Sequence, residues 1–356
     1  MAIPQSRQAS RPAVDPNLTL GAYADRWLGL IAPTVKKRTL ASYTQTLRLH
    51  LRPALGAVRV RDLHKGRIKV LLAEKLTGGL SRNSVRIIHA TLRAMLNSAL
   101  DDGAILANPA DKLGRSLHLV KSATTRQEEI KALDRSQLQV FLSYATTEPR
   151  HTALFLLMAR TDLRLGEALA VQWPDMDFTA REIRVARAFS AGDLDTPKAG
   201  HGHTVDMSQQ LALTLRRLPH MRTAEAFRRE WLTLPVWLFV NAAGDALDES
   251  GVRKAFARVL TAAKLPDHFH PHCLRHTFAS LSLQQGQSPA YVQRQLGHAS
   301  IQLTVDTYGK WLPMGNMAAV DKLDSWPLAT GETPSPVASG SSVVAAWWQK
   351  EQANYL

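Results

Sequence analysis

The sequence predicts a mainly α-helical protein of two domains, in which an all-α helical bundle precedes an α+β domain with a small antiparallel β-sheet. Three observations predict this fold class. The length of 356 residues suits two domains, and a composition of 45% hydrophobic and 21% charged residues is typical of globular proteins. Residues 18–103 place apolar side chains at intervals of three and four, which is the helical period. Short alternating stretches between residues 182 and 240 indicate strands instead.

Four amphipathic stretches predict the helical bundle, at residues 23–31, 42–51, 66–76 and 81–103. Ser81 is expected to be the N-cap of the last helix. One stripe of that helix is predicted to be buried, and its residues are Val85, Ile88, Leu92, Met95 and Ala99. The side that carries Arg82, Arg86 and Arg93 then remains available for an anion.

The charge of the chain predicts a polyanion as its partner. The formal net charge is +14, and residues 18–103 hold fifteen Lys or Arg against five Asp or Glu. A basic cluster before the second predicted helix combines cationic side chains with exposed backbone N–H groups, which favour phosphate. The expected DNA-contact residues are Lys36, Lys37, Arg38, Thr39, Arg82, Asn83, Arg86 and Arg93. For a single helix, a solvated basic surface is the alternative.

A linker and a second domain follow the helical bundle. Asn108 and Pro109, with the polar stretch up to Lys131, predict the linker. A helix is expected to start at 133–136. Residues 182–188 and 202–207 alternate like paired strands, and 191–202 reads as the flexible tip of their hairpin. Residues 237–240 resemble another short strand.

These features divide the chain into five expected segments. The segments are a flexible tail at 1–17, a helical DNA-binding domain at 18–110, a linker at 111–131, a catalytic domain at 132–312 and an extension at 313–356. The extension is rich in Pro, Gly and Ser and then carries the apolar run Val343–Trp348. Docking of this run on a neighbouring protomer and a disordered end are equally favoured.

The single cysteine, Cys273, excludes an intramolecular disulfide and a cysteine-built zinc site, so a reducing, cytoplasmic compartment fits best. The N-terminus lacks the apolar stretch of a signal peptide. No apolar run approaches the roughly 18 residues that span a bilayer, so an integral membrane protein is not expected. Binding to a membrane surface is not expected either, because the chain lacks a sustained amphipathic basic helix with aromatic anchors.

Four segments of the second domain hold side chains suited to phosphate chemistry. Arg164 follows an apolar helix and has Glu167 three residues later to brace it, although a surface ion pair is the commoner arrangement. Lys198 lies at the expected hairpin tip, where most lysines are simply solvated. His272 and Arg275 share a helix face. The fourth segment runs from Leu296 through His298 to Tyr308, and Ser300 can cap its short helix.

A metal site is the weaker interpretation of the histidines. His268, His270 and His272 are close in sequence, but Pro271 interrupts their spacing, and no carboxylate cluster completes a tetrahedral site. For Tyr308, the simpler interpretation is a tyrosine in a hydrophobic core.

Taken in order, the segments resemble the tyrosine recombinases of the phage integrase family. The family signature is an arginine in a TGLRxGE-like box, a hairpin lysine, an HxxR box, an LGH box and a later tyrosine. The matching residues are Arg164, Lys198, His272 with Arg275, His298 and, ten residues on, Tyr308. The resemblance extends over residues 18–311, because the basic helical segment is similar to the family's core-binding domain.

The resemblance implies cleavage of DNA through a 3'-phosphotyrosyl intermediate. Tyr308 would be the nucleophile, while Arg164 and Arg275 would hold the non-bridging phosphate oxygens. Lys198 would be the general acid for the leaving 5'-oxygen, and His272 would assist removal of the Tyr308 proton. His298 would donate a hydrogen bond to the phosphate, and Glu167 would fix Arg164.

The implied partners are double-stranded DNA with recombination sites and three further copies of the chain in a tetramer on that DNA. Accessory DNA-bending or directionality proteins also belong to such systems. No metal and no cofactor are implied, since cationic side chains supply the positive charge and the phosphotyrosine keeps the phosphoester energy. Residues 1–17 are too few for the arm-binding domain of many phage integrases, which favours transposon-like and integron-like relatives of mobile genetic elements.

Two positions depart from the family pattern, and two other functions stay open. Asp162 stands where the family mostly has glycine, and Cys273 where it mostly has aspartate, so local packing is expected to differ there. A catalytically silent DNA-binding protein of recombinase origin is one alternative. A relative of type IB topoisomerases or telomere resolvases is the other.

Overall fold

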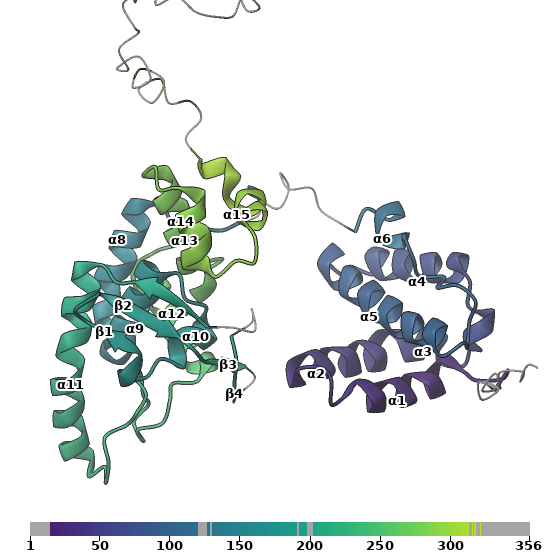
Figure 1. The fold of residues 1–356 in the computed structure, drawn as a ribbon, viewed down its shortest axis with the longest axis horizontal. Helices are drawn as coiled ribbons and strands as arrows, with labels where there is room; N and C mark the ends of the chain where they lie inside the picture. The colour runs from purple at the N-terminus through teal and green to yellow at the C-terminus, as the bar shows by residue number, and fades with distance from the viewer. Residues whose placement is uncertain are drawn as a thin grey trace, which may run out of the picture. The chain divides into compact units, whose positions relative to one another are not determined.

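The structure is a computed structural model that describes residues 15–119, 127, 128, 130–190, 192–197, 202–312, 315, 317 and 321. Its two large hydrophobic cores share no residue: one gathers side chains between Leu20 and Leu119, and the other gathers side chains between Leu133 and Leu274. We therefore describe a helical region, residues 15–119, and an α+β region, residues 130–312, each by itself (Figure 1). The predicted fold class, mainly helical with small antiparallel sheets, is confirmed.

The helical region is built from amphipathic helices, as the sequence predicts. Its α-helices are α1 (Leu20–Ile31), α2 (Lys37–Thr46), α3 (Arg52–Leu55), α4 (Lys65–Thr77), α5 (Arg82–Asp101) and α6 (Leu113–Ser116). Ser81 caps α5, because its Oγ accepts the Ser84 N–H at 3.1 Å. All five residues of the predicted stripe of α5 are buried. The periodicity thus identified both the start of this helix and its packed face.

The second predicted helix, residues 42–51, is not one regular helix. α2 ends at Thr46, and a π-helical turn, Leu47–Leu51, leads into α3. Pro53 gives the physical reason, since proline has no N–H and its ring clashes with the carbonyl four residues earlier. The wider turn still buries Leu47, Leu51 and Leu55 in one core.

Part of the predicted linker packs against the helical region. α6 lies within residues 111–131, and Leu113 and Leu119 are both buried in the helical core. His89 on α5 also hydrogen-bonds the carbonyl of Ala110 at 2.8 Å. The chain up to Leu119 therefore belongs structurally with α1–α6. The predicted extension 313–356 lies outside the described residues except for 315, 317 and 321.

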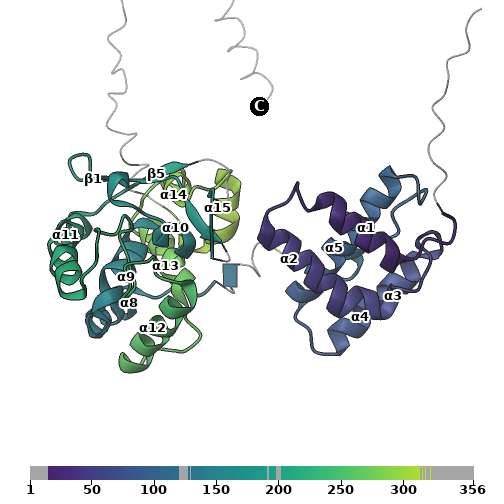
Figure 2. The same cartoon turned by 90° about the horizontal axis from the view of Figure 1, so that it is seen from below.

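The α+β region alternates helices with short strands (Figures 1 and 2). Its α-helices are α8 (Arg135–Tyr144), α9 (Pro149–Thr161), α10 (Leu165–Leu169), α11 (Gln209–Arg229), α12 (Glu249–Ala262), α13 (Pro271–Gln284), α14 (Pro289–Leu296) and α15 (Ile301–Tyr308). Its strands are β1 (Met176–Asp177), β2 (Glu182–Val185), β3 (Ala188–Ser190), β4 (Asp193–Asp195) and β5 (His203–Asp206). Asp134 caps α8, which confirms the predicted helix start.

The main sheet has three antiparallel strands in the order β1-β2-β5. Ile183 pairs with Met176 on one side and with Val205 on the other, so the predicted pairing of the two alternating stretches is confirmed. Ile183, Val185 and Val205 are buried, and the intervening residues face outward. One face of the sheet therefore contributes to the core of the α+β region.

Two strand predictions need correction. The stretch 182–188 is divided, because Ala188 begins β3, which pairs with β4 in a separate two-stranded sheet. The expected flexible tip thus contains strand β4, while residues 191 and 198–201 lie outside the described residues. The strand predicted at 237–240 is wrong: Trp237 and Val240 form only isolated bridges, with Gln172 and Ala246 respectively. Leu238 to Val240 are apolar because they fill the core, and burial alone does not make a strand.

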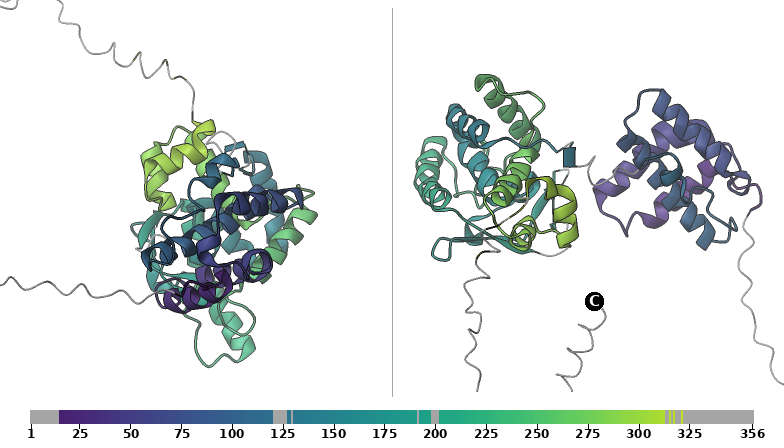
Figure 3. Two further views of the ribbon diagram at one scale, coloured as in Figure 1. Left: turned by 90° about the vertical axis from the view of Figure 1, so that its right-hand side faces the viewer. Right: turned by 90° about the horizontal axis from the view of Figure 1, so that it is seen from above.

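The last three helices form a small core of their own. α13, α14 and α15 pack together, and Figure 3 shows this part of the chain in green to yellow-green. The buried residues of this core are Ala279, Leu283, Val292, Leu296 and Tyr308. Among the described residues, no helix combines the length and the apolar character that crossing a membrane requires.

Candidate active site

Arg164 lies at the break between α9 and α10, where the sequence analysis expected it. Asp162 is the C-cap residue that follows α9, its backbone is left-handed at φ 69°, and Arg164 is the N-cap of α10. Glu167 holds Arg164 at two points: its carboxylate accepts the Arg164 backbone N–H at 2.9 Å and a guanidinium N–H at 2.7 Å. Because the Glu167 side chain is almost completely buried, the guanidinium is fixed from the protein side.

Arg275 joins the ends of two helices. It lies on α13 and is 2% exposed. Its Nη1 donates to the carbonyl of Asp162 at 2.6 Å, and its Nη2 donates to the carbonyl of Leu296 at 2.7 Å. These carbonyls lie at the C-terminal ends of α9 and α14, where backbone oxygens lack helical partners and attract cations. The other N–H groups of Arg275 remain for a further acceptor.

Asp162 contacts the same guanidinium with its side chain. Its Oδ1 lies 3.4 Å from Nε of Arg275. The residue is fully buried, and neither carboxylate oxygen has a hydrogen-bond partner among the described residues. Burial raises the pKa of Asp162 well above its ordinary value, although the positive charge of Arg275 opposes this shift. The sequence analysis expected only a packing difference here, whereas the structure brings Asp162 against a predicted site residue.

Tyr308 ends α15 and is 1% exposed. Its hydroxyl lies 2.8 Å from Nδ1 of His276, and its ring is nearly parallel to that of His298, with the ring centres 6.4 Å apart. Burial raises the pKa of Tyr308, and the negative charge of Asp162 raises it further. The phenol therefore keeps its proton at neutral pH. The sequence left a core residue and a site residue as alternatives for Tyr308. In the structure its ring belongs to a hydrophobic core, and its hydroxyl contacts a histidine of the candidate site.

Three histidines surround the Tyr308 hydroxyl and the Arg275 guanidinium. Burial, followed by the charge of Arg275, lowers the pKa of His276 and that of His298 to about 4. The pKa of His272 is also lowered, first by desolvation and then by His276 and Arg275. The rings of His272 and His276 are perpendicular, with their centres 4.8 Å apart. All three imidazoles are therefore neutral at neutral pH and can accept as well as donate a proton.

The backbone around α13 and α14 explains how these histidines are placed. His272 is the second residue of α13, and the His270 N–H at the start of that helix bonds Cys273 Sγ at 3.4 Å. Gly297 ends α14 in the left-handed conformation. His298 follows immediately, and its Nδ1 lies 2.9 Å from Oγ1 of Thr304 on α15. Local capping therefore orients each ring.

The sequence analysis missed two histidines of the site. His276 follows His272 by four residues, so helical spacing could have selected it. His203 on β5 lies against Gly297, where a Cβ would be 3.2 Å from its ring. Burial lowers the pKa of His203, and Glu167 and Arg164 also influence it. The local sequence of β5 does not identify His203 as a site residue, because the residues that surround it, such as Gly297 and Glu167, come from distant segments of the chain.

Lys198 lies outside the described residues. Lys36 is the N-cap of α2, followed by Lys37, Arg38 and Thr39 in the first turn. The other four predicted contacts, Arg82, Asn83, Arg86 and Arg93, lie on α5. In the helical region Arg86 donates to Asn83, and Arg93 pairs with Asp111 at 2.7 Å.

Among the described residues, no three His, Cys, Asp or Glu side chains gather as metal ligands. His268, His270 and His272 do not converge, since the rings of His270 and His272 are 6.4 Å apart and stacked. The two arginines of the site, Arg164 and Arg275, can therefore bind an anion. The neutral histidines around the Tyr308 phenol can accept a proton. This combination suits transfer of a phosphoryl group to Tyr308.

Comparison with protein families places the chain among known recombinases. The family model described as "Phage integrase family" matches residues 131–311, and the model of the phage integrase N-terminal SAM-like domain matches residues 19–72. A XerC-like tyrosine recombinase of Caldanaerobacter subterraneus subsp. tengcongensis is 23% identical over 86% of this chain and 83% of its own length. Tyrosine recombinase XerC 1 of Ralstonia nicotianae is 28% identical over 81% of this chain and 88% of its own length.

Solved structures agree in fold. The Tn1549 transposon integrase in complex with transposon right end DNA superposes with a TM-score of 0.72 at 20% identity, covering 86% of this chain and 100% of that one. A lambda integrase dimer bound to a COC' core site gives a TM-score of 0.58 at 20% identity, covering 80% of this chain and 97% of that one. Because the family match spans 181 of the 356 residues and includes Arg164, Arg275 and Tyr308, the chain belongs to the phage integrase family of tyrosine recombinases.

Proposed function

We propose that the protein is a site-specific DNA recombinase in which Tyr308 attacks the scissile phosphate of one DNA strand. Members of its family cleave and rejoin DNA. The Tyr308 oxygen forms the new bond to phosphorus, the bond to the 5'-oxygen breaks, and a 3'-phosphotyrosyl enzyme and a free 5'-hydroxyl result. The reverse attack by a 5'-hydroxyl rejoins the strand, so the reaction needs no nucleotide cofactor.

The observation that carries the proposal is the hydrogen bond between Tyr308 and His276 beside the buried Arg275. A protonated phenol is a poor nucleophile, and the neutral Nδ1 of His276 is in position to accept its proton as the oxygen attacks. Arg275 and Arg164 neutralise charge on the non-bridging oxygens. We assign the acceptance of the Tyr308 proton to His276 in place of His272, because it is His276 whose Nδ1 lies 2.8 Å from the Tyr308 hydroxyl. His272 and His298 would then contact the phosphate.

The leaving 5'-oxygen needs a proton of its own. Lys198 is the proposed general acid for that oxygen, and Glu167 is the residue that positions Arg164. Two hydrogen bonds between Glu167 and Arg164 support the role of Glu167, whereas Lys198 lies outside the described residues. No step is assigned to a metal ion.

Tyr308 has to become accessible before it can attack. At 1% exposure its oxygen cannot touch a DNA phosphate, so α15 or its neighbours have to move when DNA binds. Such a requirement keeps the nucleophile from reacting before the substrate is in place. It also gives the DNA-bound state a structural signature, namely a Tyr308 hydroxyl that is exposed to the phosphate while it stays within hydrogen-bond reach of His276.

The proposed assembly follows from the reaction. Exchange between two duplexes requires four active sites, which we propose are supplied by a tetramer on DNA. Residues 18–110 would bind DNA opposite the catalytic domain 132–312, with 111–131 between them, and the extension 313–356 would dock on a neighbouring protomer. The basic first turn of α2 and the arginines of α5 supply the charge for the DNA contact.

Covalent capture tests the proposal directly. Wild-type protein and Tyr308→Phe are incubated in EDTA with nicked duplex DNA from the flanks of the gene that encodes the chain, and covalent protein–DNA complexes are resolved on a denaturing gel. We expect a covalent band with the wild type and none with Tyr308→Phe. Binding without any covalent band, on these flanks and on a broad DNA library, would contradict the proposal and favour a silent DNA-binding protein. Relaxation of supercoiled DNA that lacks any specific site would favour a topoisomerase.

A further inference from the structure

A groove on the α+β region, distant from the candidate site in the chain, gathers an unusual concentration of arginines. The groove lies between the start of α9 and the C-terminal half of α11, and its volume is about 690 Å³. Four arginines line it, and they are Arg150, Arg222, Arg228 and Arg229. Glu225 is the one acid in the lining, so the walls carry an excess of three positive charges. None of these residues has a part in the proposed recombination chemistry.

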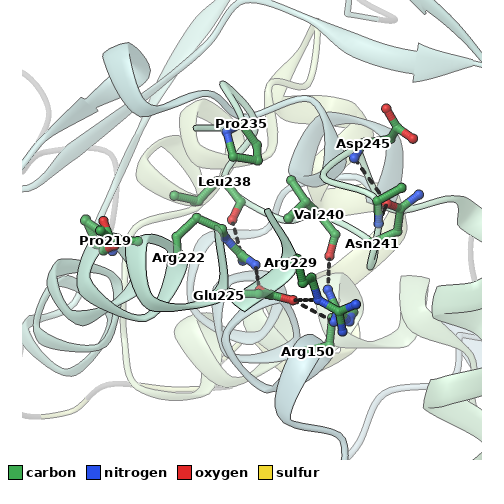
Figure 4. A network of polar contacts seen from close by, with 12 residues as sticks. Arg150, Pro219, Arg222, Glu225, Arg229, Pro235, Leu238, Val240, Asn241 and Asp245 are labelled. Carbon is green, nitrogen blue, oxygen red and sulfur yellow. Dashed lines mark hydrogen bonds and ion pairs between the residues drawn. The ribbon is translucent and has the colours of Figure 1, made fainter. Parts of the chain in front are cut away.

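Three of the arginines share the single carboxylate (Figure 4). Arg150 Nη2 lies 2.8 Å from Glu225 Oε1, Arg229 Nε lies 3.1 Å from the same oxygen, and Arg222 bonds Oε2. Arg150 also donates to the carbonyl of Val240 at 3.0 Å, which ties the 237–241 segment to α9. These contacts use only some of the N–H donors of the three arginines, since each guanidinium carries five.

Arg222 is the least expected member of this cluster. The buried stripe of α11 runs through Leu211, Leu215, Leu218, Arg222 and Ala226, so a charged residue occupies a core position. Arg222 is 9% exposed, and its Nε has no hydrogen-bond partner among the described residues. Burial lowers the pKa of Arg222. Arg222 also lines the groove, whose walls carry an excess of positive charge, and such a surface favours an added anionic acceptor such as a carboxylate.

Large apolar side chains project around the same end of α11. Phe227 is 87% exposed, Leu232 is fully exposed, and Met221 and Leu234 are more than half exposed. Phe227 lines a second hollow together with His220 and Arg228. Exposed apolar side chains mark interaction sites, and arginine and aromatic residues are enriched in the hot spots of protein–protein interfaces.

We propose that this surface, the α11 groove, binds an acidic segment of a second protein whose carboxylates alternate with apolar side chains. The carboxylates would enter the groove beside Arg222 and Arg229, and the apolar side chains would cover Met221 and Phe227. DNA is the less suitable occupant, because protein–DNA interfaces are strongly polar, and exposed phenylalanine and leucine side chains gain nothing from contact with a phosphate backbone. α11 also lies on the side of the α+β region away from α15, which carries Tyr308 (Figures 1 and 2).

A defined peptide tests the α11 groove on the full-length protein. The probe is a fluorescein-labelled 16-residue peptide in which Leu and Glu recur at helical spacing, and its counterpart has Lys in place of every Glu. Fluorescence anisotropy at low salt measures both affinities. We expect the acidic peptide to bind at least tenfold more tightly than the basic one. Equal affinity for both peptides would overturn the proposal.

Matched variants on the same helix localise the binding. The double variant Phe227→Ser/Arg228→Glu is expected to weaken the acidic peptide at least tenfold, and both positions are exposed, so the fold should be retained. The control variant Leu213→Ser/Arg217→Glu removes an exposed leucine and an arginine of α11 outside the groove, and it is expected to leave the affinity unchanged. An equal loss in both variants would show mere electrostatic attraction and overturn the proposal.

Two further arms separate other occupants. Affinity for a 30-base-pair duplex and covalent capture are expected to be the same in both double variants, and a selective loss of DNA affinity in Phe227→Ser/Arg228→Glu would assign the surface to nucleic acid instead. The variant Trp347→Ala/Trp348→Ala, in the full chain, is expected to leave peptide affinity unchanged. Tighter peptide binding by that variant would identify the chain's own extension as the occupant and overturn the proposal.

Discussion

At the scale of single residues, the placement of Asp162 costs free energy in two ways. A non-glycine residue in the left-handed region is strained by about 1–2 kcal/mol, and a buried carboxyl without a hydrogen-bond donor adds about 1–3 kcal/mol. In return, the same residue contacts Arg275 with its carbonyl and with its Oδ1. An ionised Asp162 competes with a phosphate for that guanidinium, whereas a protonated one does not.

Replacing Asp162 should therefore stabilise the fold and favour DNA cleavage. We expect Asp162→Gly to raise the free energy of unfolding by about 1–3 kcal/mol, because strain and the buried carboxyl are both removed. Asp162→Asn keeps the shape, tolerates the left-handed backbone and removes the charge, so it separates the two causes. Urea unfolding and the rate of covalent capture at saturating DNA are the measurements. Slower capture in both variants would mean that the carboxyl is needed to hold Arg275.

His276 should act as a base over a wide pH range. Because burial lowers its pKa to about 4, the imidazole is neutral above about pH 5 and is lost as an acceptor only as the pH falls toward 4. We expect His276→Ala to slow covalent capture about 10²-fold or more at pH 7 with unchanged DNA affinity. His268→Ala, an exposed histidine of the same region, is the control. A capture rate near that of the wild type in His276→Ala would exclude His276 as the acceptor of the Tyr308 proton.

At the scale of elements, the close approach of α10 to β3 fixes the arginine of the first box. Gly166 lies in the first turn of α10, and a Cβ on it would lie 2.2 Å from the carbonyl oxygen of Phe189. No side chain fits in that space. The glycine of the box is thus explained by packing against β3, and it allows Arg164 and Glu167 to reach their positions.

The variant Gly166→Ala tests this contact. We expect a loss of about 1–3 kcal/mol in the free energy of unfolding, as for overpacked cores, together with slower covalent capture because α10 carries Arg164. Gly29→Ala on α1 is the matched control, since nothing lies within 4 Å of its added Cβ. That control is expected to gain up to about 1 kcal/mol from helix propensity. Equal stability of the two variants would contradict the proposed close contact.

Elements with a strong period could be predicted from the sequence, and elements set by distant contacts could not. α5 was predicted with its cap and buried stripe, because Ser81 and the spacing of Val85 to Ala99 are local signals. The strand expected at 237–240 failed, because its apolar residues serve the core without pairing in a sheet. In the site, Arg164 and Glu167 were predictable from their spacing, whereas the contact of Asp162 with Arg275 joins residues 113 positions apart.

At the scale of the whole molecule, the excess of positive charge governs the first encounter with DNA. The net charge is +14, and most of the excess lies in residues 18–103. Each Lys or Arg that neutralises a phosphate releases a counterion, so affinity falls steeply with salt. On α5, Arg86 bonds only the neutral Asn83 in the described contacts, whereas Arg93 is paired with Asp111. The two arginines should therefore differ in their contribution.

Salt titrations of DNA binding can resolve that difference. We expect Arg86→Gln to reduce the slope of log affinity against log salt by about 0.9, the value for one phosphate contact on duplex DNA. Arg93→Gln is expected to reduce it less, since Asp111 already balances that charge. Fluorescence anisotropy with a duplex between 50 and 300 mM salt, roughly the range in which such slopes are linear, is the measurement. Identical slopes for Arg86→Gln and the wild type would exclude a phosphate contact at Arg86.

The buried thiol beneath the candidate site makes the protein convenient for spectroscopy. Cys273 is the one cysteine in the 356-residue chain, it is fully buried, and burial raises the pKa of its thiol. Since maleimide dyes react with accessible thiolates, Cys273 should stay unlabelled in the folded protein. One cysteine introduced on the exposed face of α5 and another on that of α11 would then carry the only two dyes, a donor and an acceptor. Distance changes between the two regions during DNA binding could be followed by single-molecule fluorescence without first removing a native cysteine.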